Sequence, residues 1–143
     1  MKIFSFNKKE HLCGKNNIER LFEAGNAFVA YPFRVVYLFE KQEDAANDAE
    51  VKVLISVPKK KHRRANVRNR LKRLTRESYR LNKHDFINFA KENTLNVSLA
   101  FQYISDDVLK FNLIQNKTRE ILIKLKSNIK NKQQNEAIQT DNK

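Results

Sequence analysis

The sequence predicts an α+β fold in which helices pack on one sheet. Three observations predict this class. Apolar residues recur at helical spacing in three segments, 15–25, 65–81 and 106–129. Three other segments are rich in β-branched and aromatic residues or alternate apolar with polar side chains, as strands do. The order helix, strand, strand, helix, strand, helix is typical of helices layered on a single sheet.

The length of 143 residues and the hydrophobic content of 41% fit one domain with its own core. No run of about 18 apolar residues occurs, so we expect no membrane span. The first residues, "MKIFSFNKKEHL", lack a sustained apolar segment and a small-residue cleavage site. We therefore expect no signal peptide and a cytoplasmic location. Cys13 is the only cysteine, which excludes an internal disulfide and a multi-cysteine zinc site.

The first helix is predicted at 15–25. Its apolar residues fall at i, i+3 and i+4, and the pattern stops at Gly25. Asn16 or Asn17 is the expected N-cap, because short polar side chains satisfy the free N–H groups of a first turn.

Two strands follow the first helix. The segment 33–40 comes after Pro32 and is dense in Val, Tyr and Phe. The segment 51–57 is similar and ends at Pro58, which cannot donate to a strand ladder. The polar and acidic segment 41–50 between them reads as a turn. We therefore expect the two strands to form a hairpin.

The helix at 65–81 has an apolar stripe formed by Val67, Leu71, Leu74, Ser78 and Leu81. The segment 94–104 alternates apolar with polar residues and is predicted to be a half-buried strand. The last helix is predicted at 106–129, with a break near Phe111. Asp106 and Asp107 are its N-cap candidates. Residues 127–143 hold few apolar side chains, and we expect them to form a disordered polar tail.

Most of the positive charge lies in one segment. Residues 59–83 contain twelve Lys and Arg side chains and one acid, so they carry +11 of the net charge of +13. This charge indicates a polyanionic partner, nucleic acid ahead of an anionic membrane surface. A face built for solubility interleaves Glu with Lys at i, i+4, but here Lys72 has Arg68 and Arg76 at those spacings. We therefore expect a phosphate backbone to neutralise this helix.

At about 100° per residue, five cations of the helix fall on the arc opposite its apolar stripe. They are Arg68, Lys72, Arg73, Arg76 and Arg80, with Asn69 among them. Arg70 falls at the edge of the stripe, where it either holds the helix against the sheet or contacts nucleic acid. The connection before the helix extends the positive surface with Lys59, Lys60, Lys61, Arg63 and Arg64. Arginine predominates in the helix, and its planar fork suits phosphate.

The segment "RRANVRNRLKRLTRESYRL" at 63–81 strongly resembles the signature of the bacterial ribonuclease P protein family, whose centre reads R-N-R-x-K-R-x-x-R-E. The matching residues are Arg68, Asn69, Arg70, Lys72, Arg73, Arg76 and Glu77. Seven fixed positions in ten residues are far more specific than a generic basic helix. The similarity extends over about residues 6–125. "IERLFEAG" is similar to the family's first helix, and "VKVLISVPKKK" is similar to its strand before a lysine pair.

The resemblance implies a two-layer α/β sandwich like domain 2 of ribosomal protein S5, with a left-handed βαβ crossover. The family domain would span residues 1–126. It also implies a protein subunit of ribonuclease P that binds the catalytic RNA through the R-N-R helix and needs no protein partner. In this family the RNA removes the 5′ leader of precursor tRNA with Mg²⁺. The protein itself would bind no cofactor and supply no catalytic group.

The resemblance further implies a cleft, between the sheet and the first helix, for the single-stranded 5′ leader of precursor tRNA. Such a platform needs aromatic or apolar faces close to cations. The candidates are Phe22, Phe33, Val35 and Tyr37, with Lys59 and Lys60 nearby. Any one of the four candidates is equally compatible with a place in the core.

The candidate catalytic residues are sparse. His11, His62 and His84 stand apart from one another and from any useful carboxylate pair, which agrees with a non-catalytic protein. The alternative function is a ribosomal or general RNA-binding protein. A helix-turn-helix protein would need two helices joined by a tight turn in the basic region, but strands are predicted on both sides of it. An autonomous protein nuclease would need a cluster of catalytic side chains, and the sequence shows none.

Overall fold

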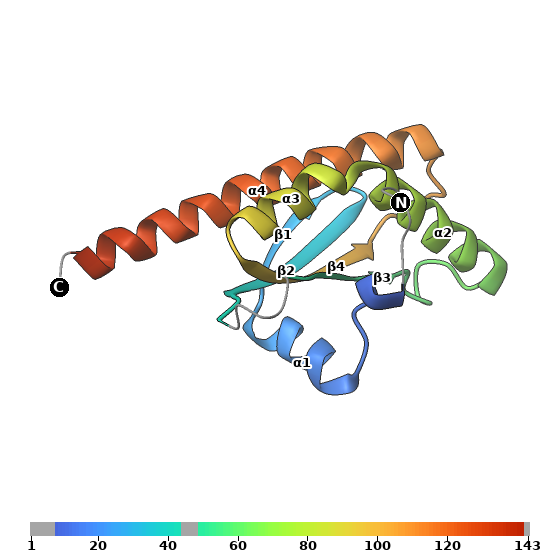
Figure 1. The fold of residues 1–143 in the computed structure, drawn as a ribbon. Coiled ribbons are helices and arrows are strands. Elements are labelled where there is room, and N and C mark those ends of the chain that lie inside the picture. The colour runs from blue at the N-terminus through green and yellow to red at the C-terminus, as the bar shows by residue number, and fades with distance from the viewer. Residues whose placement is uncertain (1–7, 44–48, 142–143) are drawn as a thin grey trace.

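The structure is a computed structural model, and it describes residues 8–43 and 49–141. Within them a four-stranded sheet separates one helix from three others (Figure 1). The elements are, in chain order, η1 (Lys8–Glu10), α1 (Lys15–Ala24), β1 (Asn26–Ala30), β2 (Phe33–Lys41), β3 (Val51–Ser56), α2 (Ala65–Asn82), α3 (His84–Glu92), β4 (Leu95–Tyr103) and α4 (Phe111–Asp141). The α+β class predicted from the sequence is confirmed.

The sheet order is β1-β2-β4-β3. β2 pairs antiparallel with both β1 and β4, whereas β3 runs parallel to β4. The expected hairpin between 33–40 and 51–57 is therefore wrong, because β4 lies between these two strands. The polar segment that joins them falls partly on residues 44–48, which lie outside the described residues. The chain passes from β3 to its parallel neighbour β4 through α2 and α3, since parallel strands need a long crossover.

The larger core lies between the sheet and the layer of α2, α3 and α4. It contains one face of β2 together with alternate residues of β4, among them Leu99 and Phe101. Figure 1 shows α2, α3 and α4 on the same side of the sheet. Leu71 and Tyr79 of α2 and Leu125 of α4 are fully buried there. Burial of these large side chains stabilises the basic helix on the sheet.

The smaller core lies under α1, on the opposite face of the sheet (Figure 1). It consists of Leu12, Leu21, Val36 and Ala100. Gly25 ends the helix where a Cβ atom would lie 2.3 Å from the Leu21 carbonyl oxygen and 2.9 Å from that of Tyr37. Only glycine therefore allows α1 to turn so tightly into β1 and the sheet.

Several local expectations are corrected by the structure. The N-cap of α1 is Gly14, and Asn17 instead donates from Nδ2 to the carbonyl oxygen of Cys13 at 3.2 Å. β1 and α3 were not expected from the sequence. The last helix begins at Phe111, so Asp106 and Asp107 lie in the preceding loop and do not cap it.

α4 also continues beyond the boundary expected at residue 126. Its helical backbone reaches Asp141, and Ile129 is fully buried against the larger core. Figure 1 shows the C-terminal part of α4 extending past the end of the sheet. Residues 127–141 are thus part of a helix, whereas residues 142 and 143 lie outside the described residues.

Candidate nucleic-acid interface

The buried side of α2 includes two small hydroxyl side chains, Thr75 and Ser78. Thr75 donates from Oγ1 to the Leu71 carbonyl oxygen at 2.8 Å, and Ser78 donates from Oγ to that of Leu74 at 2.9 Å. These bonds satisfy the hydroxyl groups within the helix, so they can be buried beside Leu71 and Tyr79. The centre of the buried side, at Leu71, Thr75, Ser78 and Tyr79, is therefore rotated about 60° from the centre of the predicted stripe.

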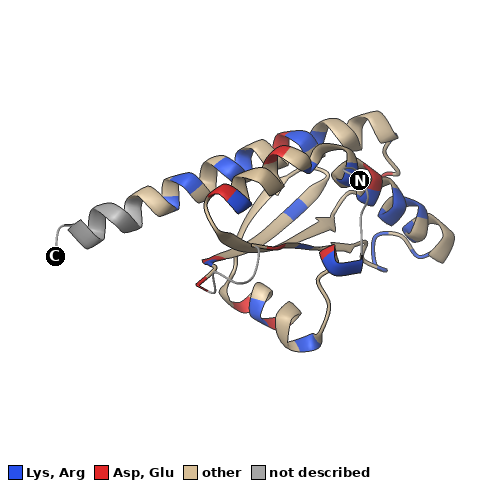
Figure 2. Ribbon diagram, viewed as in Figure 1, with Lys and Arg blue, Asp and Glu red and all other residues tan. Residues whose placement is uncertain are grey.

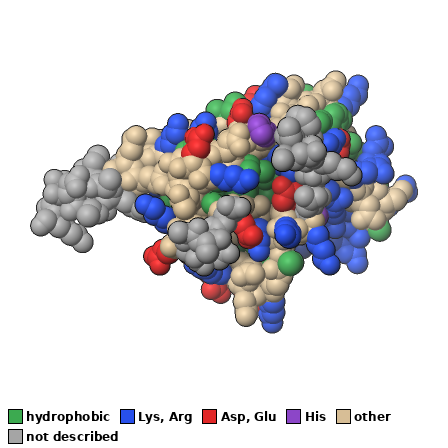
Figure 3. Space-filling view, viewed as in Figure 1, with side chains coloured by type: hydrophobic (Ala, Val, Ile, Leu, Met, Phe, Trp, Pro, Cys, Tyr) green, Lys and Arg blue, Asp and Glu red, His purple; other side chains and the backbone are tan. Residues whose placement is uncertain are grey.

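The free face of α2 shifts by the same rotation. Its exposed polar and basic residues are Asn69, Arg70, Arg73 and Arg76. Arg70 is therefore not packed between the helix and the sheet, and its exposed guanidinium group is available to a ligand. Lys72 is half-buried at the edge of this face. Figure 2 shows Lys and Arg along α2, and Figure 3 shows them gathered over α2 and the connection before it.

Arg68 has a different position from the one expected. It is half-buried, and its Nη1 donates to the carbonyl oxygens of His62 at 2.9 Å and Arg63 at 2.7 Å. The guanidinium group therefore holds the connection before α2 against the first turns of the helix. This side chain stabilises the local backbone, although it belongs to the R-N-R sequence.

Arg80 is half-buried and paired with Glu77 one turn earlier. Its Nε donates to Oε2 of Glu77 at 3.0 Å, and its Nη2 donates to the other carboxylate oxygen. The hydrogen bond from Arg80 lowers the pKa of the Glu77 carboxyl group, and the same bond raises the pKa of Arg80. The pair fixes the direction of one cation beside the free arginines.

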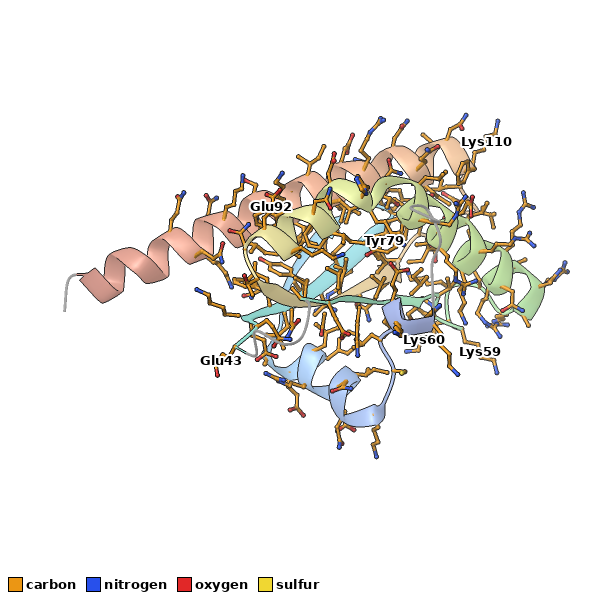
Figure 4. All side chains as sticks on the ribbon, in the orientation of Figure 1. Glu43, Lys59, Lys60, Tyr79, Glu92 and Lys110 are labelled. Carbon is orange, nitrogen blue, oxygen red and sulfur yellow. The ribbon has the colours of Figure 1, made fainter. Side chains whose placement is uncertain are left out.

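The connection between β3 and α2 carries five exposed cations. They are Lys59, Lys60, Lys61, Arg63 and Arg64. Figure 4 labels Lys59 and Lys60, which lie beyond the end of β3 at the side of the molecule that α2 occupies. Lys61 Nζ lies 3.3 Å from a carboxylate oxygen of Asp106.

His62 lies among these cations, but its side chain is turned inward. Its side chain is buried, and its Nε2 forms a hydrogen bond with the carbonyl oxygen of Ser105 at 2.9 Å. Because that carbonyl oxygen can only accept, Nε2 carries the proton. The imidazole ring lies 5.7 Å from the ring of Tyr103, and Tyr31 bonds to the Ser105 hydroxyl group at 2.6 Å. The basic connection is thus fastened to the end of β4.

Three of the four expected leader-cleft residues face away from such a cleft. Phe33, Val35 and Tyr37 are buried in the larger core, under the layer of α2, α3 and α4. They alternate on one face of β2, as predicted, but that face is the covered one. Their side chains therefore have no exposed surface on which a base could stack, and the assignment of these three residues to the cleft is corrected.

The face beside α1 carries a different set of residues. Phe22 of α1 is 39% exposed, so it lies outside the core. On the sheet, Val29, Arg34 and Gln102 form one row, because Arg34 pairs with both of the others. Val29 is 62% exposed, and Arg34 Nη1 donates to Gln102 Oε1 at 2.7 Å. This row lies on the same face as Val36, which packs under α1.

Sequence reasoning missed this row because it selected the aromatic residues of β2. The residues of this row could have been recognised from alternation along β2. Its even-numbered residues share one face, and this is the face that α1 partly covers at Val36. Ser56 pairs with Gln102 and extends the row to the end of β3, two residues before Pro58. The row therefore leads toward the lysines of the connection.

The metal-ligating side chains of the described residues are scattered. Over residues 8–43 and 49–134, whose side chains the structure describes, no three or more His, Cys, Asp or Glu side chains gather where they could hold a metal ion. The helices in these ranges also include none that is both long and apolar enough to cross a membrane.

The chain is similar to proteins of one family. A family model described as Ribonuclease P matches residues 6–126. A "Ribonuclease P protein component" of Porphyromonas gingivalis is 39% identical over 126 residues, which cover 88% of this chain and 90% of the relative. One from Chlorobaculum tepidum is 39% identical over 71 residues, or 50% of this chain and 46% of the relative.

Solved structures have the same fold. The RNase P protein of Staphylococcus aureus matches with a TM-score of 0.58 and 21% identity, covering 82% of this chain and 95% of that one. The RNase P protein of Thermotoga maritima matches with a TM-score of 0.58 and 23% identity, covering 79% and 94%.

Proposed function

The chain belongs to the ribonuclease P protein family, and from this premise we propose how it acts in the ribonucleoprotein. The relatives are protein components of an enzyme that also contains RNA, so this chain functions with an RNA subunit. We propose that α2 binds that RNA. The single observation that carries the proposal is the free face of α2, where Arg70, Arg73 and Arg76 are exposed while the opposite side of the helix is anchored in the core.

The physical reason lies in the uncompensated charge of this face. Arg73 and Arg76 lie one turn apart, and like charges at this spacing destabilise an isolated helix. Glu77 is the nearby acid, and its carboxylate is already bonded to Arg80. Phosphate oxygens would neutralise the repulsion, and each guanidinium fork can donate two bonds to them. The connection 59–64 would extend the contact with its exposed cations.

The second part of the proposal concerns the substrate. We assign the 5′ leader of precursor tRNA to the face of the sheet beside α1, with Phe22, Val29 and Arg34 as contacts and Gln102 orienting the arginine. An exposed apolar surface next to a cation suits the bases and phosphates of a single strand. The row ends near Lys59 and Lys60, so the leader would run from the sheet toward the connection before α2.

The cleavage step belongs, in this proposal, to the RNA subunit and its Mg²⁺ ions. The described residues form no metal site of their own, so we derive no step of the reaction through a metal held by this chain. The contribution of the protein is electrostatic and positional. It lowers the repulsion between two polyanions and holds the leader in place. The ribonucleoprotein would act in the cytoplasm, on precursor tRNA.

Reconstitution tests the function directly. The full chain, the ribonuclease P RNA of the same organism and a 5′-labelled precursor tRNA are combined at low Mg²⁺, and release of the leader is followed on a gel. We expect little cleavage by the RNA alone, none by the protein alone, and rapid cleavage by the two together. Leader release by the RNA-free protein would contradict the proposal, as would an RNA whose rate the protein leaves unchanged.

A further inference from the structure

A groove lies between α3 and α4, on the helical side of the molecule. It has a volume of about 350 Å³ and begins at the C-terminal end of α2. Its walls combine the apolar residues Leu81, Phe86 and Ile123 with the basic residues Arg119 and Lys126. Ile123 is 66% exposed, so the groove is open to a ligand.

The positive charge of the groove comes from one flank of α4. At about 100° per residue, Arg119, Lys126 and Lys130 fall within one narrow arc on the side toward α3. The Nζ atoms of Lys126 and Lys130 lie 5.5 and 5.6 Å from the centre of the Phe89 ring. This ring attracts both ammonium groups and holds them at the edge of α3. Asp85 is the acid that lines the groove, and it leaves the basic groups in excess.

His84, at the start of α3, adds a hydrogen-bond donor. Asn88 donates from Nδ2 to Nε2 of His84 at 3.2 Å, because an amide nitrogen cannot accept. In the neutral imidazole ring the proton then lies on Nδ1. His84 is exposed and lines the groove, so it can donate to an anionic oxygen without becoming protonated.

The groove continues the surface already assigned to RNA. Arg76 and Arg80 lie one turn apart on α2, and the next two residues, Leu81 and Asn82, form one end of the groove. A strand that follows the arginines of α2 toward its C-terminal end therefore reaches the groove at Leu81 and Asn82.

We propose that the groove between α3 and α4 binds the phosphodiester backbone of the same RNA subunit, as a contact separate from the arginines of α2. This inference rests on the proposed function. Arg119, Lys126 and His84 would contact phosphate oxygens, and Ile123 would pack against sugar or base edges. Apolar side chains between cations are the arrangement that unpaired nucleotides require, so the strand is single where it enters the groove.

The test compares two lysines of the same helix. Lys126→Glu alters the groove, and Lys124→Glu is its matched control. Lys124 also lies over a phenylalanine ring, with Nζ 4.7 Å from the centre of Phe28, but on the opposite flank of α4. Both variants change the net charge equally, so a general loss of attraction to RNA affects both. Arg73→Glu reports on α2, and Arg119→Glu is a second groove variant.

Binding of each full-length variant to the ribonuclease P RNA of the same organism is measured by filter retention at fixed salt, with thermal melting as the check of folding. We expect Lys126→Glu and Arg119→Glu to bind at least about tenfold more weakly than Lys124→Glu, as for lost charged hydrogen bonds. If Lys126→Glu lowers the melting temperature, Lys126→Gln is used in its place.

The outcomes distinguish a failure of the groove inference from a failure of the proposed function. If Arg73→Glu weakens binding but the groove variants match Lys124→Glu, the groove inference is wrong and the role of α2 stands. If the parent chain does not bind this RNA, the proposed function is overturned together with the inference. If the groove variants keep RNA affinity but lose binding to a polyglutamate peptide, the groove takes an acidic peptide and the inference is overturned.

Discussion

Arg68 and Arg73 are arginines of the same helix, but their guanidinium groups have different surroundings. Arg68 donates to the backbone oxygens of His62 and Arg63, whereas Arg73 is exposed on the free face of α2. The R-N-R sequence therefore combines a residue that supports the local backbone with residues open to a ligand. Sequence alone could not separate these roles, because the separation depends on the path of the chain before the helix.

Substitution of these two arginines should separate stability from binding. Arg73→Ala should weaken RNA binding by about 1–3 kcal/mol and leave the melting temperature unchanged, because it removes only a phosphate contact. Arg68→Ala should weaken RNA binding too, but it should also lower the melting temperature, because it removes the hydrogen bonds that hold the connection before α2. Filter binding and thermal melting of both variants measure the two effects. Equal melting temperatures for Arg68→Ala and the parent would contradict the supporting role.

Glu77 gives a pH dependence at the scale of one residue. Arg80 lowers the pKa of its carboxyl group, so the folded protein holds the unprotonated form more strongly than the unfolded chain does. The stabilisation is therefore present above the unfolded pKa of about 4.5 and is lost as the pH falls through the lower folded value. We expect the parent to be more stable than Glu77→Gln at pH 7, and the difference to shrink as the pH falls below about 4.5. Urea unfolding over a pH series from 7 downward measures the difference. A difference that does not depend on pH over this series would show that the carboxylate charge is not the cause.

At the scale of elements, the long-range pairing of strands was the part that the sequence could not provide. The segments 33–40 and 51–57 were correctly predicted as strands to within one residue at one end, but their order in the sheet was not. β4 lies between them and pairs with both, with β2 on one side and β3 on the other. Alternation along a strand identifies its faces but not its neighbours.

The two missed elements have separate explanations. β1, Asn26–Ala30, is short and holds two alanines, so its β-propensity is weak and pairing with β2 decides its structure. α3 carried a readable signal, since Phe86, Phe89 and Ala90 fall at i, i+3 and i+4 and are all buried. The rotation of the free face of α2 could also be anticipated in part, because Thr75 and Tyr79 extend the apolar stripe once their hydroxyl groups are allowed to be buried.

A prediction for α4 follows from the position of Ile129. Ile129→Ala should reduce the free energy of unfolding by about 2–4 kcal/mol, because the side chain is fully buried in the larger core. Ile123→Ala is the control on the same helix, and its effect should stay within about 0.5 kcal/mol, because Ile123 is 66% exposed. Urea unfolding followed by circular dichroism measures both. Equal small effects would show that α4 is not anchored beyond residue 126.

At the scale of the whole molecule, the free face of α2, proposed for the RNA subunit, and the sheet face proposed for the leader lie in different layers. The free face of α2 belongs to the helical layer, and the row of Val29, Arg34 and Gln102 belongs to the opposite face of the sheet. The connection 59–64 runs between them. If the proposed assignments hold, one small domain would contact two RNA molecules, the RNA subunit and the substrate, without either occupying the site of the other.

The face beside α1 can be tested with leader-bearing and mature tRNA. The variant Val29→Ser/Arg34→Ala should weaken binding of precursor tRNA to the reconstituted enzyme by about 1–3 kcal/mol, because it removes an apolar contact and a charged one. Mature tRNA lacks the leader, so its binding should not change. Val108→Ser, at an exposed valine in the loop before α4, is the control. Equal weakening for both tRNAs would exclude the leader from this face.

The inward turn of His62 has a consequence for the enzyme as a whole. Its hydrogen bond to Ser105, together with the contacts of Arg68 to the same connection, leaves the chain little freedom between the sheet and the basic helix. The separation between the place where the leader would lie and the place where the RNA subunit would dock is then a fixed length of the protein. A rigid spacer of this kind would do more than attract RNA electrostatically. Its length would determine how many nucleotides lie between the two anchoring points. The protein would in this way help to set the position of the cut, which in the proposed function is made by the RNA subunit.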